Sequence, residues 1–238
     1  MLARSFHVLD WAAQAEGRAQ RAAWPAAVLR EGTAGSGLPM LLRRRLTPLG
    51  QAAIATACEV GADAAMHYVF TSRHGEFARS LRLLEALANH QPLSPAEFTL
   101  CVHNALPGLL SIARHAMAGH TAIAAGPDSL AGGLLEVAGL LAVDPATPVL
   151  LVHFDDDLPA PYDALRREPA AGPVALAVLF GAADRGGLPI QVSATPQPWN
   201  ARATTAGAAL GLLRFLRDGL PSLGVEGARL RLEWRRAA

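Results

Sequence analysis

The chain has 238 residues, of which 51% are hydrophobic and 17% are charged, and its formal net charge at pH 7 is +1. A chain this long and apolar can bury a sizeable core in one large or two small domains, which excludes intrinsic disorder and collagen-like repeats. The near-neutral charge provides no basic field of the kind that attracts nucleic acid, so we expect no nucleic-acid partner.

The 21 basic residues are all arginine, since the sequence contains no lysine. A P-loop, a Schiff base and a Ser-Lys mechanism each need a lysine amine, so these chemistries are excluded. The composition also indicates a GC-rich, bacterial genome. Cys58 and Cys101 cannot build a disulfide framework or a Cys-rich metal site, and His115 and His120 are too scattered to predict zinc. We expect a reducing compartment, no metal and no cofactor.

No segment predicts a membrane span or a signal peptide. The longest apolar runs, around residues 130–143 and 174–183, are shorter than the roughly 20 residues needed to cross a bilayer, and Glu136 interrupts the first. Asp10 and Glu16 fall where a signal peptide needs an uninterrupted apolar core. We therefore expect a cytoplasmic protein.

In chain order, the hydrophobic pattern predicts helices and strands that alternate. Helices are expected at residues 8–23, 48–64, 76–89, 105–117, 130–141 and 205–218. Strands are expected at residues 67–71, 121–125, 149–154, 174–180, 191–195 and 228–234. This alternation indicates an α/β architecture with helices covering a mostly buried mixed sheet. No repeat or linker is evident, so we expect a single domain over residues 1–238.

Two of the predicted helices carry further information. The helix at residues 76–89 has an apolar face that includes Phe77 and Leu84, and this amphipathic pattern predicts that it packs on a sheet. The helix at residues 130–141 contains Gly132, Gly133 and Gly139, which imply a closely packed backbone.

Three segments, taken together, carry a family likeness. They are residues 69–76 (VFTSRHGE), 93–98 (LSPAEF) and 102–108 (VHNALPG), of which Ser-Pro-x-x-Phe followed by His-Asn-x-x-x-Gly is the specific part. Residues 44–49 and the acidic pair after the 149–154 strand also fit. In these segments the chain resembles the N-terminal domain of β-ketoacyl synthase-like proteins, in the short forms often called chain-length factors.

The resemblance covers residues 40–185 and implies a fold. We expect one half of a thiolase-like fold, a layered α-β-α arrangement around a mixed, mostly buried sheet, rather than the full duplicated synthase. Residues 186–238 are then expected to form a C-terminal extension packed on the same domain.

The resemblance also implies that the chain is catalytically silent. Active synthases of this family carry a Cys nucleophile at a strand-to-helix turn, which here corresponds to residues 124–129. Gly126 best occupies the nucleophile position, and a shifted alignment selects Pro127 or Asp128 instead. The family also uses two histidines from its second half, whereas no histidine follows His153 in this chain. No catalytic residue is therefore assigned.

The partners implied are an active ketoacyl synthase in a heterodimer, or a second copy of this chain, with an acyl carrier protein engaged indirectly. The context would be polyketide, aryl-polyene or fatty-acid-like biosynthesis. A half-length fold would leave a sheet edge or an apolar face uncovered, and the pairing strand is expected at residues 120–125. The interface or tunnel candidates are His103, Asn104, Leu106, Pro107, Gly108, Thr121 and Ile123.

Alternatives remain open. A residual acyltransferase or hydrolase would use Ser129 or Cys101, and a third possibility is a homodimeric scaffold. A nucleophilic Ser129 needs a neighbouring base, and the favoured interpretation is that Ser129 or Asp128 caps the following helix. His103 lies at an expected strand-to-helix junction and is interpreted as a buried, hydrogen-bonded histidine rather than as the base of a Cys101 dyad. The acidic residues 155–157 are interpreted as a solvated loop rather than a metal site.

Overall fold

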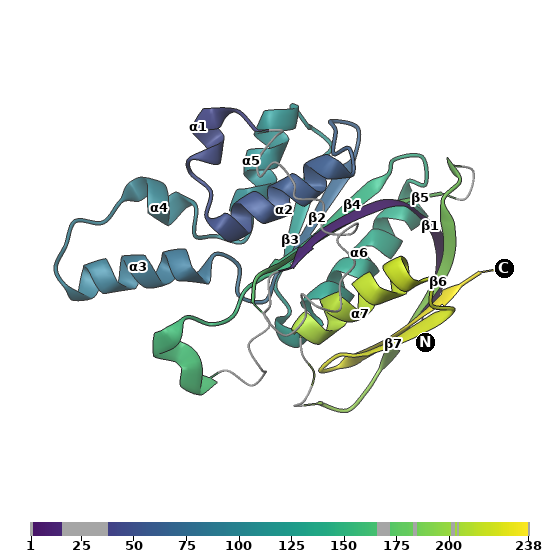
Figure 1. Ribbon diagram of the computed structural model, residues 1–238. Helices are drawn as coiled ribbons and strands as arrows, with labels where there is room; N and C mark the ends of the chain where they lie inside the picture. The colour runs from purple at the N-terminus through teal and green to yellow at the C-terminus, as the bar shows by residue number, and fades with distance from the viewer. Residues whose placement is uncertain are drawn as a thin grey trace.

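The computed structural model describes residues 2–15, 38–165, 172–182, 185–200, 203 and 205–237. The strands form one mixed sheet of eight in the order β3-β2-β4-β5-β1-β6-β8-β7 (Figure 1). Strand β2 runs parallel to β3 and β4, and every other neighbouring pair is antiparallel. The sheet and its covering helices confirm the predicted α/β class with a mixed sheet.

The elements have the following bounds. The strands are β1 (Leu2–Ala15), β2 (His67–Thr71), β3 (His120–Ile123), β4 (Val149–Asp155), β5 (Val174–Gly181), β6 (Leu188–Pro196), β7 (Ser222–Glu226) and β8 (Leu230–Arg236). The helices are α1 (Met40–Arg43), α2 (Pro48–Glu59), α3 (Phe77–Ala88), α4 (Pro95–Thr99), α5 (Ala105–Arg114), α6 (Ser129–Val143) and α7 (Thr205–Asp218).

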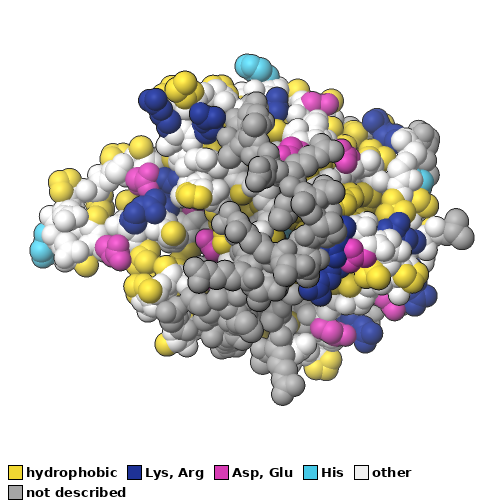
Figure 2. Space-filling view, in the orientation of Figure 1, with side chains coloured by type: hydrophobic (Ala, Val, Ile, Leu, Met, Phe, Trp, Pro, Cys, Tyr) yellow, Lys and Arg dark blue, Asp and Glu magenta, His cyan; other side chains and the backbone are white. Residues whose placement is uncertain are grey.

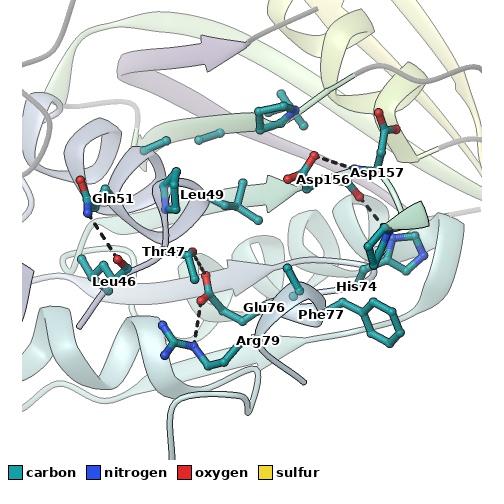
Figure 3. Close-up of a pocket in the computed structure, with 18 of the residues that line it drawn as sticks. Leu46, Thr47, Leu49, Gln51, His74, Glu76, Phe77, Arg79, Asp156 and Asp157 are labelled. Atoms are coloured by element: carbon teal, nitrogen blue, oxygen red, sulfur yellow. Dashed lines mark hydrogen bonds and ion pairs between the residues drawn. The ribbon is translucent and has the colours of Figure 1, made fainter. Parts of the chain in front are cut away.

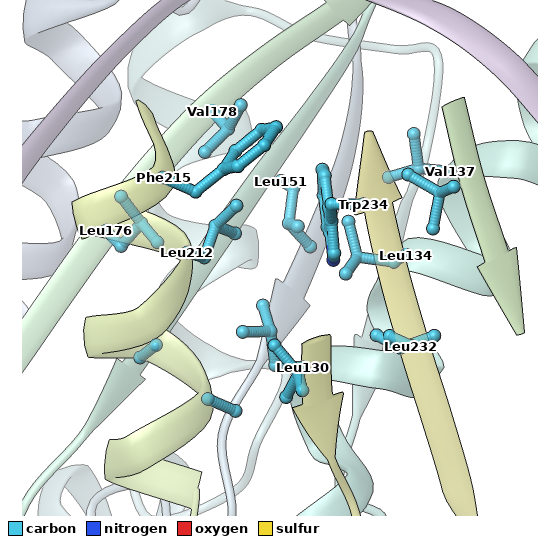
Figure 4. Packing of buried hydrophobic residues seen from close by; sticks show 14 of the residues in the cluster. Leu130, Leu134, Val137, Leu151, Leu176, Val178, Leu212, Phe215, Leu232 and Trp234 are labelled. Atoms are coloured by element: carbon cyan, nitrogen blue, oxygen red, sulfur yellow. The ribbon is translucent and has the colours of Figure 1, made fainter. Parts of the chain in front are cut away.

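Helices cover both faces of the sheet, which therefore has two cores. On one face α6 and α7 pack on the strands, and Phe215 and Trp234 meet there with ring centroids 6.0 Å apart (Figure 4). On the other face α2 and α5 cover Tyr68 and Phe70. Because β4 and β5 are buried on both sides, every residue of these two strands is buried. This layering is the α-β-α arrangement expected.

Helix α6 lies close to the sheet because it carries glycine at the contact. A Cβ atom on Gly133 would collide with Cγ2 of Thr71 and lie 2.8 Å from Cδ1 of Leu151. A Cβ atom on Gly132 would lie 3.2 Å from Cγ2 of Ile123. The predicted close packing is thus confirmed for these two glycines, whereas Gly139 faces open space.

The helix predicted at residues 8–23 is wrong over residues 8–15, which belong to strand β1, and residues 16–23 lie outside the described part. Strand β1 pairs with β5 on one side and with β6 on the other. These two ladders of backbone hydrogen bonds outweigh the local helix propensity of an Ala-rich segment.

Helix α3 does not pack on the sheet, contrary to the prediction. It extends away from the sheet beside α4 (Figure 1), and Leu84 and Leu87 are 51% and 58% exposed. Figure 2 shows exposed hydrophobic side chains over this part of the molecule. The amphipathic pattern is real, but only the start of the apolar face has a described ring partner, since Phe77 contacts Tyr162 with ring centroids 5.0 Å apart, whereas Leu84 and Leu87 are exposed.

One helical segment of the described residues, Gly126–Val143, is long and apolar enough to cross a membrane by length and composition. It is 44% buried and packs against β2, β4 and α7. A core helix of a folded domain passes the same test, and this segment packs on the sheet beside α7 as a core helix does.

Candidate functional site

The carboxyl-terminal ends of the three parallel strands β2, β3 and β4 lie next to one another at one end of the sheet. Thr71 of β2 lies beside Ile123 of β3 on one side and beside His153 of β4 on the other. In open α/β sheets the crevice outside these strand ends is where ligands and reacting groups are placed. We therefore place the candidate site here.

The turn that follows β3 carries no thiol. Gly126–Asp128 form a short 3₁₀ turn, Gly126 has a φ of 60°, and α6 begins at Ser129. The two cysteines lie elsewhere, Cys58 on α2 and Cys101 between α4 and α5. The three candidate positions Gly126, Pro127 and Asp128 thus lie directly before the start of α6.

The polar side chains of this turn are already engaged. The buried Asp128 carboxylate accepts hydrogen bonds from the backbone N–H groups of Ala228 and Arg229, at 2.7 and 2.9 Å. Ser129 is fully buried, and its Oγ accepts from the N–H of Ala125 at 3.0 Å and donates to the carbonyl of Gly126 at 2.7 Å. The prediction that Ser129 or Asp128 caps α6 is wrong, because neither side chain bonds the free N–H groups of the helix. Asp128 instead binds the backbone of the β7–β8 turn, and Ser129 binds the backbone of the residues before the helix.

Asp155 is not part of a solvated loop, which corrects the prediction for this residue, whereas the adjacent Asp156 is exposed. Strand β4 extends to Asp155, whose buried carboxylate accepts from the N–H groups of Arg73 and His74, both at 3.1 Å. The Ser72 hydroxyl lies at 3.4 Å and the Nδ1 atom of His74 at 3.7 Å. Asp155 therefore holds the loop after β2 in place. Among the described residues, no three His, Cys, Asp or Glu side chains are grouped as a metal site requires.

His153 is a site residue that the sequence analysis missed. It is fully buried, its Nδ1 lies 2.9 Å from Oγ1 of Thr71, and its Nε2 has no hydrogen-bond partner in the described part of the chain. Burial lowers the pKa of His153, and the nearby Asp155 raises it by less. A histidine within the apolar run of residues 149–154 was the available signal.

The candidates between α4 and α5 lie in a turn between two helices. Residues 95–99 form α4 rather than leading into a strand, because Ser94 caps the helix and Pro95 occupies its first position. A Cβ atom on Gly75 would lie 3.2 Å from the ring of His103, whose buried Nε2 lacks a partner among the described groups. The expectation of a hydrogen-bonded His103 is therefore not met at Nε2, and Cys101 donates to the carbonyl of Phe98 at 3.0 Å instead of joining a dyad.

The remaining candidates lie on α5 and β3. Asn104 precedes α5, in which Leu106 and Pro107 are buried and Gly108 faces open space. Thr121 donates to Oε1 of Glu136 at 3.1 Å. Ile123 packs on Gly132 of α6, as described above. Strand β3 has β2 on one side and is the end of the sheet on the other.

A cavity of about 760 Å³ opens between α2, α3 and the ends of β4 and β5 (Figure 3). Its wall includes a buried ion-pair network centred on Arg79 of α3. The guanidinium bonds Glu76 at 3.2 Å, Glu97 at 2.5 Å and the carbonyl of Arg45 at 2.8 Å. Glu76 also accepts from the hydroxyl of Thr47, the residue that caps α2, at 2.6 Å. The network holds the starts of α2, α3 and α4 together.

Comparison with known proteins now adds a family. Residues 9–235 match the N-terminal domain of the β-ketoacyl synthases. The chain belongs to this family. The match reaches further in both directions than residues 40–185, on which the resemblance rested. No curated protein sequence is detectably similar to the chain.

Solved structures of ketosynthases and chain length factors share this fold. A ketosynthase in complex with its chain length factor from Xenorhabdus doucetiae matches with 27% identity and a TM-score of 0.76, over 98% of this chain and 100% of that chain. The ishigamide ketosynthase/chain length factor matches with 13% identity and a TM-score of 0.68, over 99% of this chain and 100% of that one. A type II polyketide synthase acyl-carrier protein in complex with its ketosynthase matches with 9% identity and a TM-score of 0.65, over 98% of this chain and 99% of that one. The predicted thiolase-like fold is confirmed.

Proposed function

We propose that this chain is a non-catalytic, chain-length-factor type of subunit that pairs with an active ketosynthase in polyketide, aryl-polyene or fatty-acid-like biosynthesis. The observation that carries the proposal is that residues 124–129, which connect β3 to α6 and which the family resemblance identifies with the nucleophile turn, contain no thiol. An acyl carrier protein would act on the partner and engage this chain indirectly.

The chemistry of the turn supports a silent subunit. The N-terminus of α6 offers the positive dipole end that lowers a thiol pKa and the N–H groups that stabilise an oxyanion. Gly126, however, places only hydrogen there. Ser129, the one hydroxyl within the turn, is fully buried, and both of its hydrogen-bond partners are backbone groups. Nucleophilic attack by serine requires a base to take its proton, and these contacts supply none.

The open edge of the sheet supports pairing with another subunit. An edge strand presents unpaired N–H and C=O groups, to which a strand of a second subunit can add. Near this edge, Ile112 on α5, a helix that contacts β3, and Met117, which precedes β3, expose large apolar side chains. The proposed contact surface comprises Thr121 and Ile123 on β3, residues 103–108 at the start of α5, and the exposed Ile112 on the same helix. Residues 186–238 contribute β6, β7 and β8 to the same sheet and α7 to its cover, which supports one domain over the whole chain.

Co-expression with a full-length ketosynthase from the same host tests the pairing. We expect a 1:1 complex by native mass spectrometry, weakened at least ~10-fold by Ile112→Asp because a buried unpaired charge costs more than ~1.4 kcal/mol. The matched control is Val143→Asp, since Ile112 and Val143 are 65% and 88% exposed and Val143 lies at the far end of α6. Equal complex formation by both variants contradicts the contact surface. A homodimer alone supports the scaffold alternative.

The tunnel assignment of Leu106 and Pro107 has its own test. Both side chains are buried at the start of α5, and a Cβ atom on Gly50 of α2 would lie 3.1 Å from Cδ2 of Leu106. We expect Leu106→Trp to shorten the products of the intact complex, whereas Val143→Trp, at the exposed far end of α6, leaves product length unchanged. Unchanged product length with Leu106→Trp, in a complex shown to be intact by its mass, contradicts the assignment.

A further inference from the structure

The cavity beside α2 has the size and the wall of a ligand site. Its volume of about 760 Å³ lies within the range of roughly 300–1,000 Å³ that small-molecule sites occupy. Part of the wall is apolar and is made by Leu46, Leu49, Ala52, Phe77, Val174 and Ala175. Such a wall accommodates the apolar body of a ligand. The polar groups of the wall then determine which polar or charged group the ligand needs.

Each acid in the cavity wall already accepts at least one hydrogen bond. Glu76 receives hydrogen bonds from Thr47 and Arg79. Glu97 receives hydrogen bonds from Arg79 and, at 3.1 Å, from Arg82. At the opposite end, the Asp157 carboxylate accepts from the N–H of Gly172 at 2.9 Å, and the Asp156 carboxylate accepts from the N–H of Asp157 at 2.8 Å. These contacts leave the acids of the wall little capacity to receive a donor from a ligand.

The donors, by contrast, are in excess. The side chains of Arg44 and Arg45 line the cavity and form no ion pair with any described residue. The Nε2 atom of Gln14 is buried at the wall and has no acceptor among the described groups. The N-terminus of α2, at Thr47 and Pro48, adds the positive end of a 12-residue helix. The unmatched groups therefore favour a ligand that brings oxygen acceptors and negative charge.

We propose that this cavity binds an amphipathic organic anion. Its carboxylate or phosphate would lie at the end formed by Arg44, Arg45 and the start of α2, and its apolar body would pack on the wall of Leu49, Phe77 and Val174. All of these groups belong to this chain. The site therefore does not depend on a partner subunit, and its failure would leave the proposed pairing with a ketosynthase untouched.

Binding to the full-length chain is measured by calorimetry with four probes, each below its aggregation concentration: decanoate, decyl phosphate, decanol and inorganic phosphate. Decanoate and decyl phosphate share the apolar body and differ in the anionic group, so their ranking distinguishes a carboxylate from a phosphate ligand. We expect at least one of them to bind ~10-fold or more tightly than decanol and than inorganic phosphate, because a charge-assisted hydrogen bond contributes more than one factor of ten. The proposal is overturned if decanol binds as tightly as both anions. It is also overturned if neither decanoate nor decyl phosphate binds.

Variants locate the site. We expect Arg44→Ala/Arg45→Ala to weaken binding of the better anion at least ~10-fold, and the control Arg43→Ala, an exposed arginine outside the wall, to leave it unchanged. Ala52→Phe fills the cavity without removing a charge and is expected to weaken both anions equally. Thermal unfolding of each variant shows whether it is folded. Equal affinities for the double variant and Arg43→Ala, or full affinity in a folded Ala52→Phe, place the ligand elsewhere and overturn the proposal.

Discussion

Replacing Gly133 with alanine tests whether α6 is positioned by its glycines. Alanine at an exposed helix interior stabilises by about 1 kcal/mol relative to glycine. At Gly133 the added methyl collides with Thr71 and lies 2.8 Å from Leu151, so helix and sheet must separate. Overpacking of this kind costs about 1–3 kcal/mol, and displacement of Thr71 also weakens its 2.9 Å hydrogen bond to His153, which contributes about 1 kcal/mol.

The expected net effect of Gly133→Ala is a loss of about 1–3 kcal/mol in the free energy of unfolding. Gly139→Ala in the same helix is the matched control, because its added methyl has no neighbour within 4 Å and is expected to stabilise by about 0.5–1 kcal/mol. Urea unfolding measures both variants, with the slope compared to confirm that the same surface is exposed. Equal stabilisation by the two substitutions would refute close packing of α6 on β2.

Three further outcomes follow from the buried polar groups. Asp128→Ala removes two charge-assisted bonds to the β7–β8 turn and is expected to cost about 2–4 kcal/mol in urea unfolding; a loss below about 0.5 kcal/mol would show that the turn is held by other contacts. Arg79→Met leaves the carboxylates of Glu76 and Glu97 without their main partner and is expected to lower the free energy of unfolding by about 3–5 kcal/mol. Arg82→Met, at the exposed end of the network, is expected to lower it by less than about 1 kcal/mol. Similar losses for the two variants would contradict the burial argument. Burial lowers the pKa of His153 in the folded state, so the unfolded chain binds a proton first as pH falls below about 6.5. The free energy of unfolding then decreases by up to about 1.4 kcal/mol per pH unit. His153→Gln is expected to remove this slope, and parallel curves of unfolding free energy against pH for the two proteins would contradict the assignment.

Elements with a strong local pattern could be predicted from the sequence, and elements defined by their neighbours could not. The bounds predicted for β2 and α7 are those observed, because both have an uninterrupted period and clear ends. Strand β1 was assigned to a helix because its alanines favour one locally, and only pairing on both sides makes it a strand. Strand β7 was missed because it has five residues, with Gly224 at its centre and no alternating pattern.

The candidate site divides in the same way. The turn at residues 124–129 could be located, because a strand, a Gly-Pro pair and an apolar helix follow one another directly. The roles of Asp155 and His153 depend on the register that brings β4 beside β2, and no spacing in the sequence encodes that register. The amphipathic face of α3 was predicted correctly, but a single sequence does not tell which surface such a face meets.

The most direct test of the account is where an acyl group attaches in the complex. The co-purified chain and ketosynthase are incubated with an acyl carrier protein thioester, and the intact mass of each subunit is measured. The account predicts a 1:1 complex in which the acyl mass appears on the ketosynthase and not on this chain. An acyl adduct on this chain, lost in Ser129→Ala or Cys101→Ala, would contradict the claim that it is silent.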